Sequence, residues 1–288
     1  MRSSVLLLVI SFTVIPFLLF SQIKLHTPGT DSRLFTGPGN QQPLIVGLGG
    51  SEGGNAWASD YWKKTRDQFI EKGYAFLAVG YFGISGAPDT LDRIAVETVH
   101  DAILEAAADS HIDKNRIAVI GGSRGGDLAL LLASYFKDIH CVIAIVASNV
   151  SFPGNTSHLT TSSWTYQGQE LPFVPVNEAA VPFLMKHDLR HAFESMLSDS
   201  VAQSKAEFWI EKINGPVLLL SASKDQICPS TPMAEKMMAR LKDKKFSYAY
   251  QHIVVEGEHT APLKHFTEIF SFLSTYFPVP GYSNSSGM

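Results

Sequence analysis

The sequence has little charge and little cysteine: 17% of its residues are charged, and only Cys141 and Cys228 carry thiols. Two cysteines are too few for a small scaffold held together by disulfides. A formal net charge of −4 argues against a nucleic-acid-binding protein, because such proteins usually carry a basic surface. The 45% of hydrophobic residues excludes intrinsic disorder. The 288 residues therefore fit one large domain with a sizeable core.

The amino terminus has the pattern of an export signal. Arg2 precedes residues 5–20, an apolar run that only three residues interrupt. The run is somewhat shorter than the ~20 residues of a transmembrane helix. Ser21 suits a cleavage site, but Leu19 stands where a small residue is preferred. We expect residues 1–21 to be a signal peptide or an uncleaved membrane anchor, and the protein to be secreted, periplasmic or anchored to a membrane.

The rest of the chain alternates between short apolar stretches and helix-like stretches. Strands are predicted over residues 44–48, 74–79, 116–120, 139–147, 217–221 and 248–255. Helices are predicted over residues 57–72, 92–109, 127–136, 192–211, 233–241 and 262–276. Strands that alternate with helices predict an α/β fold with right-handed crossovers and a mostly parallel sheet.

Segments rich in turn residues mark the limits of this pattern. We expect residues 27–42 to be an irregular lead-in and residues 281–288 a disordered tail, because both are rich in small polar residues, and Gly and Pro add to this in the first. Residues 22–280 are then a single α/β domain. Cys141 opens one predicted strand and Cys228 follows another, which places the sulfurs at opposite ends of a parallel sheet. We expect no disulfide between them.

One short motif carries the clearest chemical signal. Directly after the strand at residues 116–120 the chain reads Gly121-Gly122-Ser123-Arg124-Gly125-Gly126, and a helix follows. In this context G-x-S-x-G predicts a nucleophile elbow, in which a tight strand-to-helix turn exposes the serine. The motif alone is common by chance, and a plain glycine-rich turn is the alternative.

Two further residues follow in the order that a catalytic triad of this kind requires, which is serine, acid and histidine. Asp225 lies just past the strand at residues 217–221, and His259 just past the strand at residues 248–255. The carboxyl ends of parallel strands meet at the edge where open α/β proteins bind ligands. We predict Ser123 as nucleophile, His259 as general base and Asp225 as the acid that orients it. A helix cap and a surface histidine are the alternatives for the last two.

The same fold logic predicts an oxyanion hole. One backbone amide should come from Arg124, the residue after the nucleophile, and a second from Gly50 or Ser51 in the glycine-rich loop after the first predicted strand. Such a loop can also hold phosphate, but the chain matches neither G-x-x-x-x-G-K-[ST] nor G-x-G-x-x-G there. We expect no cofactor.

A long segment, residues 148–214, interrupts the alternation at the same edge of the predicted sheet. Usual connections have about 4–6 residues, and longer ones are often functional lids. We predict a substrate-binding cap whose Trp164, Tyr166 and Phe173 line an acyl pocket; the alternative is that they only pack the segment onto the sheet. His187 and His191 stand four residues apart, but H-E-x-x-H is absent and we expect no metal site.

These features resemble the α/β-hydrolase superfamily. More narrowly, the chain resembles the C-terminal catalytic domain of the acyl-CoA thioesterase and bile-acid-CoA:amino-acid N-acyltransferase family, with dienelactone hydrolases as relatives. The resemblance runs from about Pro43 to Phe277. It rests on residues 122–127, Tyr81-Phe82, Tyr166-Gln167-Gly168-Gln169-Glu170-Leu171-Pro172 and Ile213-Asn214-Gly215-Pro216-Val217.

Two departures from the family affect what the resemblance implies. Members usually carry a β-sandwich domain ahead of the catalytic one, whereas only about twenty residues lie here between the expected signal and the first predicted strand. Transferase members tend to have cysteine at the nucleophile position, where this chain has Ser123. The serine favours hydrolysis over transfer.

The resemblance implies a hydrolase that cleaves a small-molecule acyl ester or thioester through an acyl-enzyme. Acyl-CoA is the family's substrate, but coenzyme A is a cytosolic polyanion and this chain is net negative and expected to be exported. An ester, a lactone or another thioester is equally open. The alternatives are acyl transfer to an amine, a dienelactone-hydrolase- or peptidase-like reaction, and a non-catalytic protein that keeps the fold.

Overall fold

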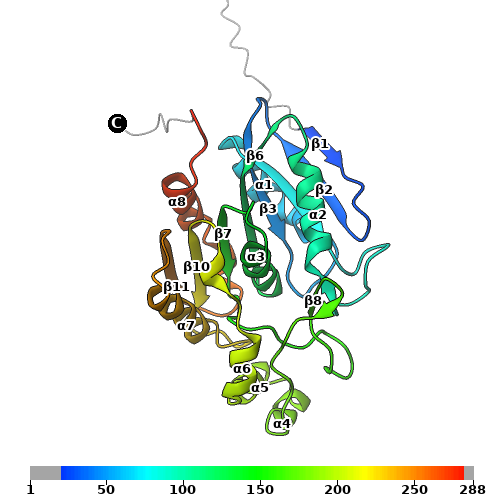
Figure 1. Ribbon diagram of the computed structural model, residues 1–288, viewed down its shortest axis with the longest axis vertical. Helices are drawn as coiled ribbons and strands as arrows, with labels where there is room; N and C mark the ends of the chain where they lie inside the picture. Colours follow the sequence, from blue (N-terminus) through cyan, green and yellow to red (C-terminus); the bar gives the residue numbers. More distant parts are fainter. Residues whose placement is uncertain (1–20, 282–288) are drawn as a thin grey trace, which may run out of the picture.

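The computed structural model describes residues 21–281, so residues 1–20 of the expected signal or anchor and residues 282–288 of the expected tail lie outside it. Within these residues the largest sheet has eight strands (Figure 1). In spatial order they are β1 (Ser21–Lys24), β2 (Asp31–Thr36), β4 (Ala75–Gly80), β3 (Gln42–Leu48), β6 (Ile112–Gly122), β7 (Cys141–Ile145), β10 (Val217–Ala222) and β11 (Tyr250–Val255). All neighbours from β4 to β11 pair in parallel, which confirms the predicted mostly parallel sheet.

The antiparallel edge of the sheet corrects one expectation. Residues 27–42 were expected to be irregular, but β2 lies in that segment and pairs antiparallel with both β1 and β4. Leu34 and Phe35 of β2 are buried, and Leu34 lies opposite Leu77 of β4. The Gly, Pro and Ser residues on either side conceal this short strand in the sequence, since they dominate the composition of the segment.

Helices cover both faces of the sheet, as the alternation predicts. Side chains of α1 (Asp60–Glu71) and α8 (Phe266–Tyr276) pack in one apolar cluster, and those of α2 (Val96–Ala107), α3 (Arg124–Tyr135) and α7 (Ser230–Asp243) in another. Successive strand residues point to opposite faces: Val119 belongs to the second cluster and Ile120 to the first. Helix α3 begins directly at Arg124, earlier than predicted.

The segment 148–214 lies at the carboxyl end of the parallel strands, at the bottom of Figure 1. It contains β8 (Trp164–Tyr166), β9 (Gln169–Glu170), α4 (Val181–Met185), α5 (Leu189–Met196), α6 (Ser200–Ala206) and the 3-10 helix η2 (Ile210–Lys212). Strand β8 pairs with β9 and with β5 (Ile94–Ala95), in a small second sheet.

The continuous helix predicted over residues 192–211 is wrong, because the chain turns twice within that stretch. Helix α5 ends at Met196, and Asp199 begins α6 by accepting hydrogen bonds from the amides of Val201 and Ala202. An aspartate in this position is a favourable helix N-cap. The broken helices pack around a small apolar cluster of their own, which includes Phe152, Ala192 and Met196.

Two further features bear on the expectations above. Within residues 21–281, none of the helices is both long enough and apolar enough to cross a bilayer. Cys141 lies at the start of β7 and Cys228 beyond the end of β10, and both are free, buried thiols. Burial raises the pKa of the Cys141 thiol, which therefore behaves as a small core residue.

Candidate active site

Ser123 occupies a strained turn between β6 and α3. Its φ of 53° and ψ of −124° are unfavourable for a residue with a side chain. The Ser123 amide donates to the Ile145 carbonyl at 2.8 Å, which extends the pairing of β6 with β7. The Ser123 carbonyl accepts from the amides of Gly126 and Asp127, which starts the helix. This is the geometry of a nucleophile elbow.

Glycines around Ser123 allow the backbone to pack closely at this turn. A Cβ on Gly121 would lie 2.1 Å from the Gly125 carbonyl oxygen, and one on Gly125 would lie 2.4 Å from the carbonyl oxygens of Leu48 and Gly49. Both distances are far below any real Cβ contact, so neither position accepts alanine without backbone movement. The glycines therefore bring the loop after β3 against the first turn of α3.

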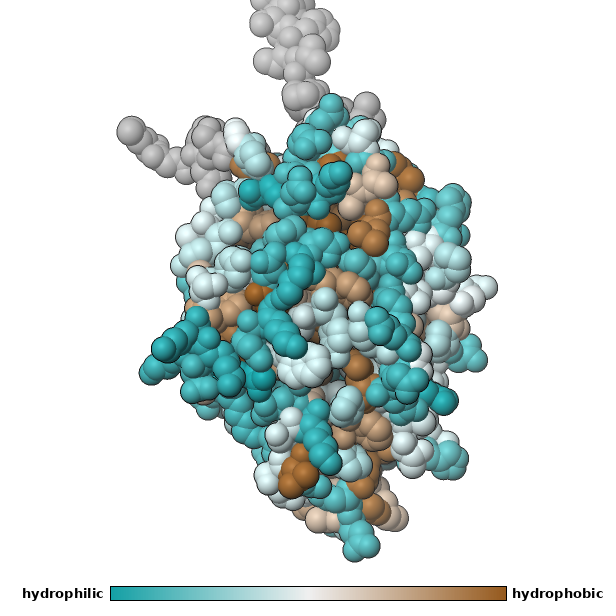
Figure 2. Space-filling view, viewed as in Figure 1, coloured by the Kyte–Doolittle hydropathy of each residue, from teal (hydrophilic) through white to brown (hydrophobic). Residues whose placement is uncertain are grey.

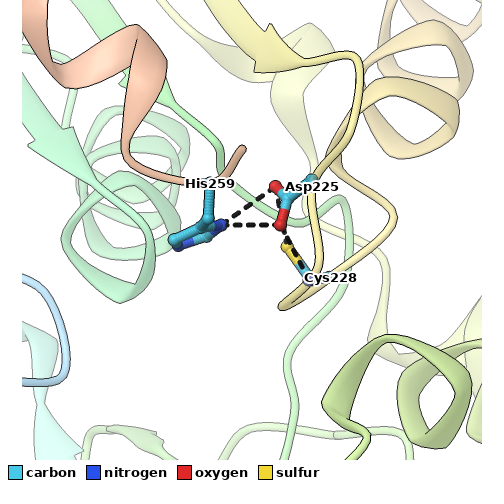
Figure 3. Close-up of side chains that lie close together, drawn as sticks. All are labelled: Asp225, Cys228 and His259. Carbon is cyan, nitrogen blue, oxygen red and sulfur yellow. Dashed lines mark hydrogen bonds and ion pairs between the residues drawn. The ribbon is translucent and has the colours of Figure 1, made fainter. Parts of the chain in front are cut away.

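Asp225 and His259 are hydrogen-bonded to each other at the ends of β10 and β11 (Figure 3). The Nδ1 atom of His259 lies 2.9 Å from both carboxylate oxygens of Asp225. The carboxylate also accepts hydrogen bonds from the amides of Ile227 and Cys228 and from the Ser230 hydroxyl, at 3.0, 3.1 and 2.6 Å. Asp225 is thus held in one orientation, and it fixes the His259 ring in turn.

The electrostatics of this pair favour an ionised aspartate. Burial alone raises the pKa of Asp225, but the hydrogen bonds from His259 and Ser230 and the charge on His259 outweigh it. The net effect is a pKa below the ordinary aspartate value. A carboxylate that stays charged can hold the proton of His259 on Nδ1 and leave Nε2 free to accept another.

Ser123 and His259 line one cavity of about 580 Å³. Within the described residues the Ser123 hydroxyl makes no hydrogen bond to His259. Such contacts often form only in the substrate complex. The structure therefore brings the three predicted residues to one edge of the sheet, with the histidine and aspartate in direct contact and the serine on the same cavity wall.

The predicted oxyanion residues lie beside Ser123. Gly50 is so close that a Cβ there would lie 3.5 Å from the Cβ of Ser123, and both Gly50 and Ser51 line the cavity. The amides of Gly50, Ser51 and Arg124 donate to no other atom of residues 21–281. The Tyr81 hydroxyl fixes the loop by donating to the Gly49 carbonyl at 2.6 Å. Free amides beside a serine can stabilise an oxyanion.

The cavity is mostly apolar, and its walls come from two sources. Trp57, Trp62 and Leu263 belong to the core of the fold. The segment 148–214 supplies Phe152, Leu159, Val176, Leu184, Leu189, Phe193 and Met196. Such an apolar space, with a few polar groups at one point, suits an uncharged acyl chain.

The three aromatics predicted to line this cavity lie elsewhere, which corrects that expectation. Trp164 is fully buried in the second core cluster, 6.3 Å from the Tyr81 ring. Tyr166 packs against Tyr135 with a centroid distance of 4.5 Å. Phe173 lies in a separate surface hollow. Strand β8 pairs with β5 in the small sheet, and none of the three aromatic side chains lines the cavity beside Ser123.

A buried ion pair behind Ser123 was not anticipated. Arg124 and Asp127, three residues apart on α3, lie 3.5 Å apart and are both buried. Arg124 donates to the Pro153 carbonyl at 3.2 Å, and Asp127 accepts from the Ser148 amide at 2.8 Å. Burial raises the pKa of Asp127 to about 6, although Arg124 opposes the shift. The first turn of α3 therefore holds the start of segment 148–214.

Cys228 is a second residue that the sequence did not associate with the site. Its sulfur lies 3.8 Å from Asp225 Oδ2, and the residue lines the cavity. Asp225, Cys228 and His259 offer ligand atoms within 4.8 Å of one another, a set that Zn²⁺ can use. A metal ion there would have to replace the hydrogen bonds between His259 and Asp225. His187 and His191 are exposed, and His191 contacts the Asp188 carboxylate at 2.8 Å.

Comparison with known proteins identifies the family. Residues 99–261, more than half of the chain, match the family model described as "BAAT / Acyl-CoA thioester hydrolase C terminal", and residues 37–158 match the BD-FAE model. The fold is that of an α/β hydrolase. The chain belongs to the BAAT / acyl-CoA thioester hydrolase C-terminal family.

Among curated relatives, mouse acyl-coenzyme A amino acid N-acyltransferase 1 is 28% identical over 170 residues, which is 59% of this chain and 38% of that protein. Human mitochondrial acyl-coenzyme A thioesterase 2 is 30% identical over 106 residues, which is 37% of this chain and 20% of that protein. The chain thus spans about two fifths or less of the length of the curated relatives that it matches.

Solved structures support the fold over nearly the whole chain. A puromycin-hydrolyzing peptidase from Mycobacterium tuberculosis superposes with a TM-score of 0.61 at 19% identity, covering 94% of this chain and 41% of that one. An esterase from Pyrococcus furiosus superposes with a TM-score of 0.57 at 16% identity, covering 90% of this chain and 93% of the esterase. The predicted α/β-hydrolase fold with a mostly parallel sheet between helices is confirmed, and the substrate-binding cap stays a prediction.

Proposed function

We propose that this protein is a serine-dependent hydrolase that cleaves an ester or thioester of an apolar acyl group. The proposal combines the family membership with one observation that carries most of the weight. Ser123, on a strained strand-to-helix turn, shares a cavity with His259, and His259 is hydrogen-bonded to a buried aspartate. These are the roles and order of a serine, histidine and aspartate triad in this fold.

In the proposed mechanism Ser123 Oγ attacks the carbonyl carbon while His259 Nε2 accepts the hydroxyl proton. The oxyanion is stabilised by the amide of Arg124 together with that of Gly50 or Ser51. As the bond to the leaving oxygen or sulfur breaks, His259 delivers its proton to that atom. Water then attacks the acyl carbon while His259 Nε2 accepts a proton from it. The bond to Ser123 Oγ breaks, His259 returns the proton to Oγ, and the free acid leaves. Asp225 stabilises the imidazolium in both steps.

The segment 148–214 is proposed to be the cap that binds the acyl chain. Phe152 and Phe193, with centroids 4.5 Å apart, form part of the apolar wall opposite the core residues. Arg190 of α5 donates to the Asp225 carbonyl at 2.8 Å, so the segment also contacts the loop that carries the acid. A cavity of about 580 Å³ accommodates a medium-sized acyl group together with the reacting carbonyl.

Covalent labelling tests the nucleophile assignment. A fluorophosphonate should modify Ser123 and leave a single labelled peptide in a mass-spectrometric digest, because only a serine with a general base reacts readily with such a reagent. The Ser123→Ala protein should take up no label. Ser51→Ala, which changes a serine on the same cavity wall, is the matched control and should label fully. A modified peptide that lacks Ser123 would disprove the assignment.

Acyl transfer to an amino acid is a second candidate, favoured by the similarity to an N-acyltransferase. It would use the same acyl-enzyme, with an amine in place of water. Product analysis by mass spectrometry in the presence of an amino acid mixture distinguishes the two. Free acid as the main product supports the hydrolase, whereas N-acyl amino acids in excess would establish the transferase.

A further inference from the structure

We propose that Zn²⁺ binds reversibly to Asp225, Cys228 and His259 and switches the proposed hydrolase off. The ion is an inhibitor and not a cofactor. Its binding follows from the geometry alone, and only the inhibition rests on the proposed function. The three side chains are buried and lie close together beyond the ends of β10 and β11 (Figure 3). They offer a carboxylate oxygen, a sulfur and an imidazole nitrogen, which are the usual ligands of zinc.

The distances between the ligand atoms are close to those of a tetrahedral zinc site. With bonds of about 2.0 Å to nitrogen or oxygen and about 2.3 Å to sulfur, neighbouring ligands lie about 3.3–3.8 Å apart. The Cys228 sulfur is 3.8 Å from Asp225 Oδ2, and His259 Nδ1 is 2.9 Å from the same oxygen. One ligand atom from each residue lies within 4.8 Å of the other two. Small movements of the His259 ring and the Cys228 side chain therefore complete the site.

Local structure already holds two of the ligands together. Asp225 and Cys228 belong to one turn after β10, in which the Cys228 amide donates to Asp225 Oδ1 at 3.1 Å. The Ser230 hydroxyl donates to Asp225 Oδ2 at 2.6 Å and orients the carboxylate further. His259 joins them from beyond the end of β11, which pairs in parallel with β10. Ligands that are oriented by hydrogen bonds in this way are typical of metal sites in proteins.

The charges of the three ligands match a divalent ion. Burial raises the pKa of the Cys228 thiol, so without metal the thiol is neutral. Zinc binds the thiolate, and the thiol proton is released to solvent. The thiolate and the Asp225 carboxylate together then neutralise Zn²⁺, while the imidazole of His259 adds no charge. No net charge is therefore left in the apolar cavity, where it would be costly.

Nearby cations oppose the ion only weakly. Arg124 and Arg190 are close enough for their charges to act on the Cys228 thiol. Each is paired with a carboxylate, Arg124 with Asp127 and Arg190 with Glu194. Because these positive charges are already balanced, their repulsion of Zn²⁺ is reduced.

Zinc bound here stops the proposed reaction through the histidine. Coordination by Nδ1 of His259 leaves the imidazole proton on Nε2, the atom that must accept the proton of Ser123. The Asp225 carboxylate, as a zinc ligand, no longer stabilises the imidazolium. Cys228 and His259 line the cavity, so the ion enters through it and a water molecule there supplies the fourth ligand.

The experiment measures hydrolysis of a chromogenic ester at graded concentrations of free Zn²⁺, with each protein compared to its own rate without zinc. The wild type should be inhibited, and EDTA should restore its activity. Cys228→Ala should raise the zinc concentration for half-inhibition by about 100-fold or more, since even the loss of a group that only orients a ligand costs about 10–100-fold in metal affinity. Mg²⁺ at the same concentrations should not inhibit, because it prefers oxygen ligands.

Cys141→Ala is the matched control, because Cys141 is also a buried free thiol but does not line the cavity. This variant should keep the zinc response of the wild type. Equal inhibition of the wild type and Cys228→Ala, or no inhibition of the wild type, would overturn the proposal and leave Ser123-dependent hydrolysis intact.

A second measurement does not depend on turnover. Co²⁺ takes the place of zinc and gives a thiolate-to-cobalt charge-transfer absorption only when a cysteine sulfur is a ligand. The absorption should appear in the wild type and in Cys141→Ala, and it should be absent from Cys228→Ala. If no ester or thioester is hydrolysed, the proposed function fails and the cobalt absorption still decides the metal site. Cobalt binding without this absorption would refute the site.

Discussion

The two sides of the cavity that Ser123 and His259 line are built differently. On the sheet side, Asp225 is buried and accepts hydrogen bonds from several donors, and Ser123 is held in a strained conformation between two regular elements. On the side of segment 148–214, short helices pack around a small apolar cluster. Met185 of α4 is 79% exposed, and Figure 2 shows apolar surface at the lower end of the molecule, where these helices lie.

This difference suggests that the two sides of the cavity have different roles. Groups that move protons need fixed positions, since a shift of about 1 Å can cost two orders of magnitude in rate. Groups that surround an acyl chain need only an apolar surface of suitable shape. We therefore expect substitutions on the sheet side to abolish turnover and those in segment 148–214 to alter substrate preference.

Loss of the nucleophile or base should have the largest effect. Ser123→Ala or His259→Ala should lower kcat by about 10⁴–10⁶, the range found when triad members are removed. His265→Ala is the control, because His265 lies six residues further on and does not line the cavity. Steady-state kinetics with a chromogenic ester measures all three. If activity survived His259→Ala and disappeared with His265→Ala, the assignment of His259 as the general base would be wrong.

Trp164 should matter for stability and not for substrate choice. It is fully buried in the core cluster, so Trp164→Ala should lower the free energy of unfolding by about 3–5 kcal/mol. Urea unfolding measures the change, and Trp164→Phe should cost less because the indole N–H is buried without a hydrogen-bond partner. The acyl-chain preference of the Phe variant should match the wild type. A shifted preference would instead show that Trp164 lines the acyl pocket.

Asp127 should make stability depend on pH. Its pKa is raised to about 6, so the folded protein keeps a proton that the unfolded chain releases near pH 4. Between these two pKa values the folded state therefore binds more protons than the unfolded state. The contribution of Asp127 to the free energy of unfolding falls as the pH rises. Asp127→Asn removes this effect and keeps an acceptor for the Ser148 amide.

The measurement is urea unfolding of both proteins at about pH 4.5 and about pH 7. Relative to Asp127→Asn, the wild type should lose about 2 kcal/mol over this interval. Asp109→Asn is the control, because hydrogen bonding lowers the pKa of Asp109 and its contribution has the opposite sign. A wild-type curve parallel to that of Asp127→Asn would show that folding does not raise the pKa of Asp127.

Substitution of Phe193 should have the smallest effect, which should appear as a change in acyl-chain preference. Phe193→Ala enlarges the cavity on the side proposed for the acyl chain. It should shift kcat/KM between short and long acyl substrates by about 10-fold, because one or two methylene groups in a pocket are worth about 1–3 kcal/mol. Tyr166→Ala is the control from the same segment, since Tyr166 does not line the cavity. Equal chain-length profiles in the wild type and Phe193→Ala would show that segment 148–214 does not bind the acyl chain.

The sheet and the placement of Ser123, Asp225 and His259 at its edge were predictable because regular elements leave a periodic signal. Ser123, Asp225 and His259 each follow an apolar strand, and parallel strands bring such positions to one edge. The edge strand β2 was missed because it is short and flanked by turn residues. Its pairing with β4 depends on contacts that are distant in the sequence.

The side-chain positions in segment 148–214 could not be predicted as well as those at the edge of the sheet. In irregular backbone no period indicates which side chains face inwards, so Trp164, Tyr166 and Phe173 were chosen by residue type alone. The positions of Trp164 and Tyr166 depend on the pairing of β8 with β5, which no local pattern reveals. The proximity of Cys228 to Asp225 likewise arises from the turn that follows β10.

The most direct test of the central claim is to trap the acyl-enzyme. A slow ester substrate is mixed with the protein, the reaction is quenched in acid during turnover, and the digest is analysed by mass spectrometry. The account predicts that the peptide containing Ser123 gains the mass of the acyl group, and that the gain is absent in Ser123→Ala. An acyl group found on another residue during turnover would contradict it.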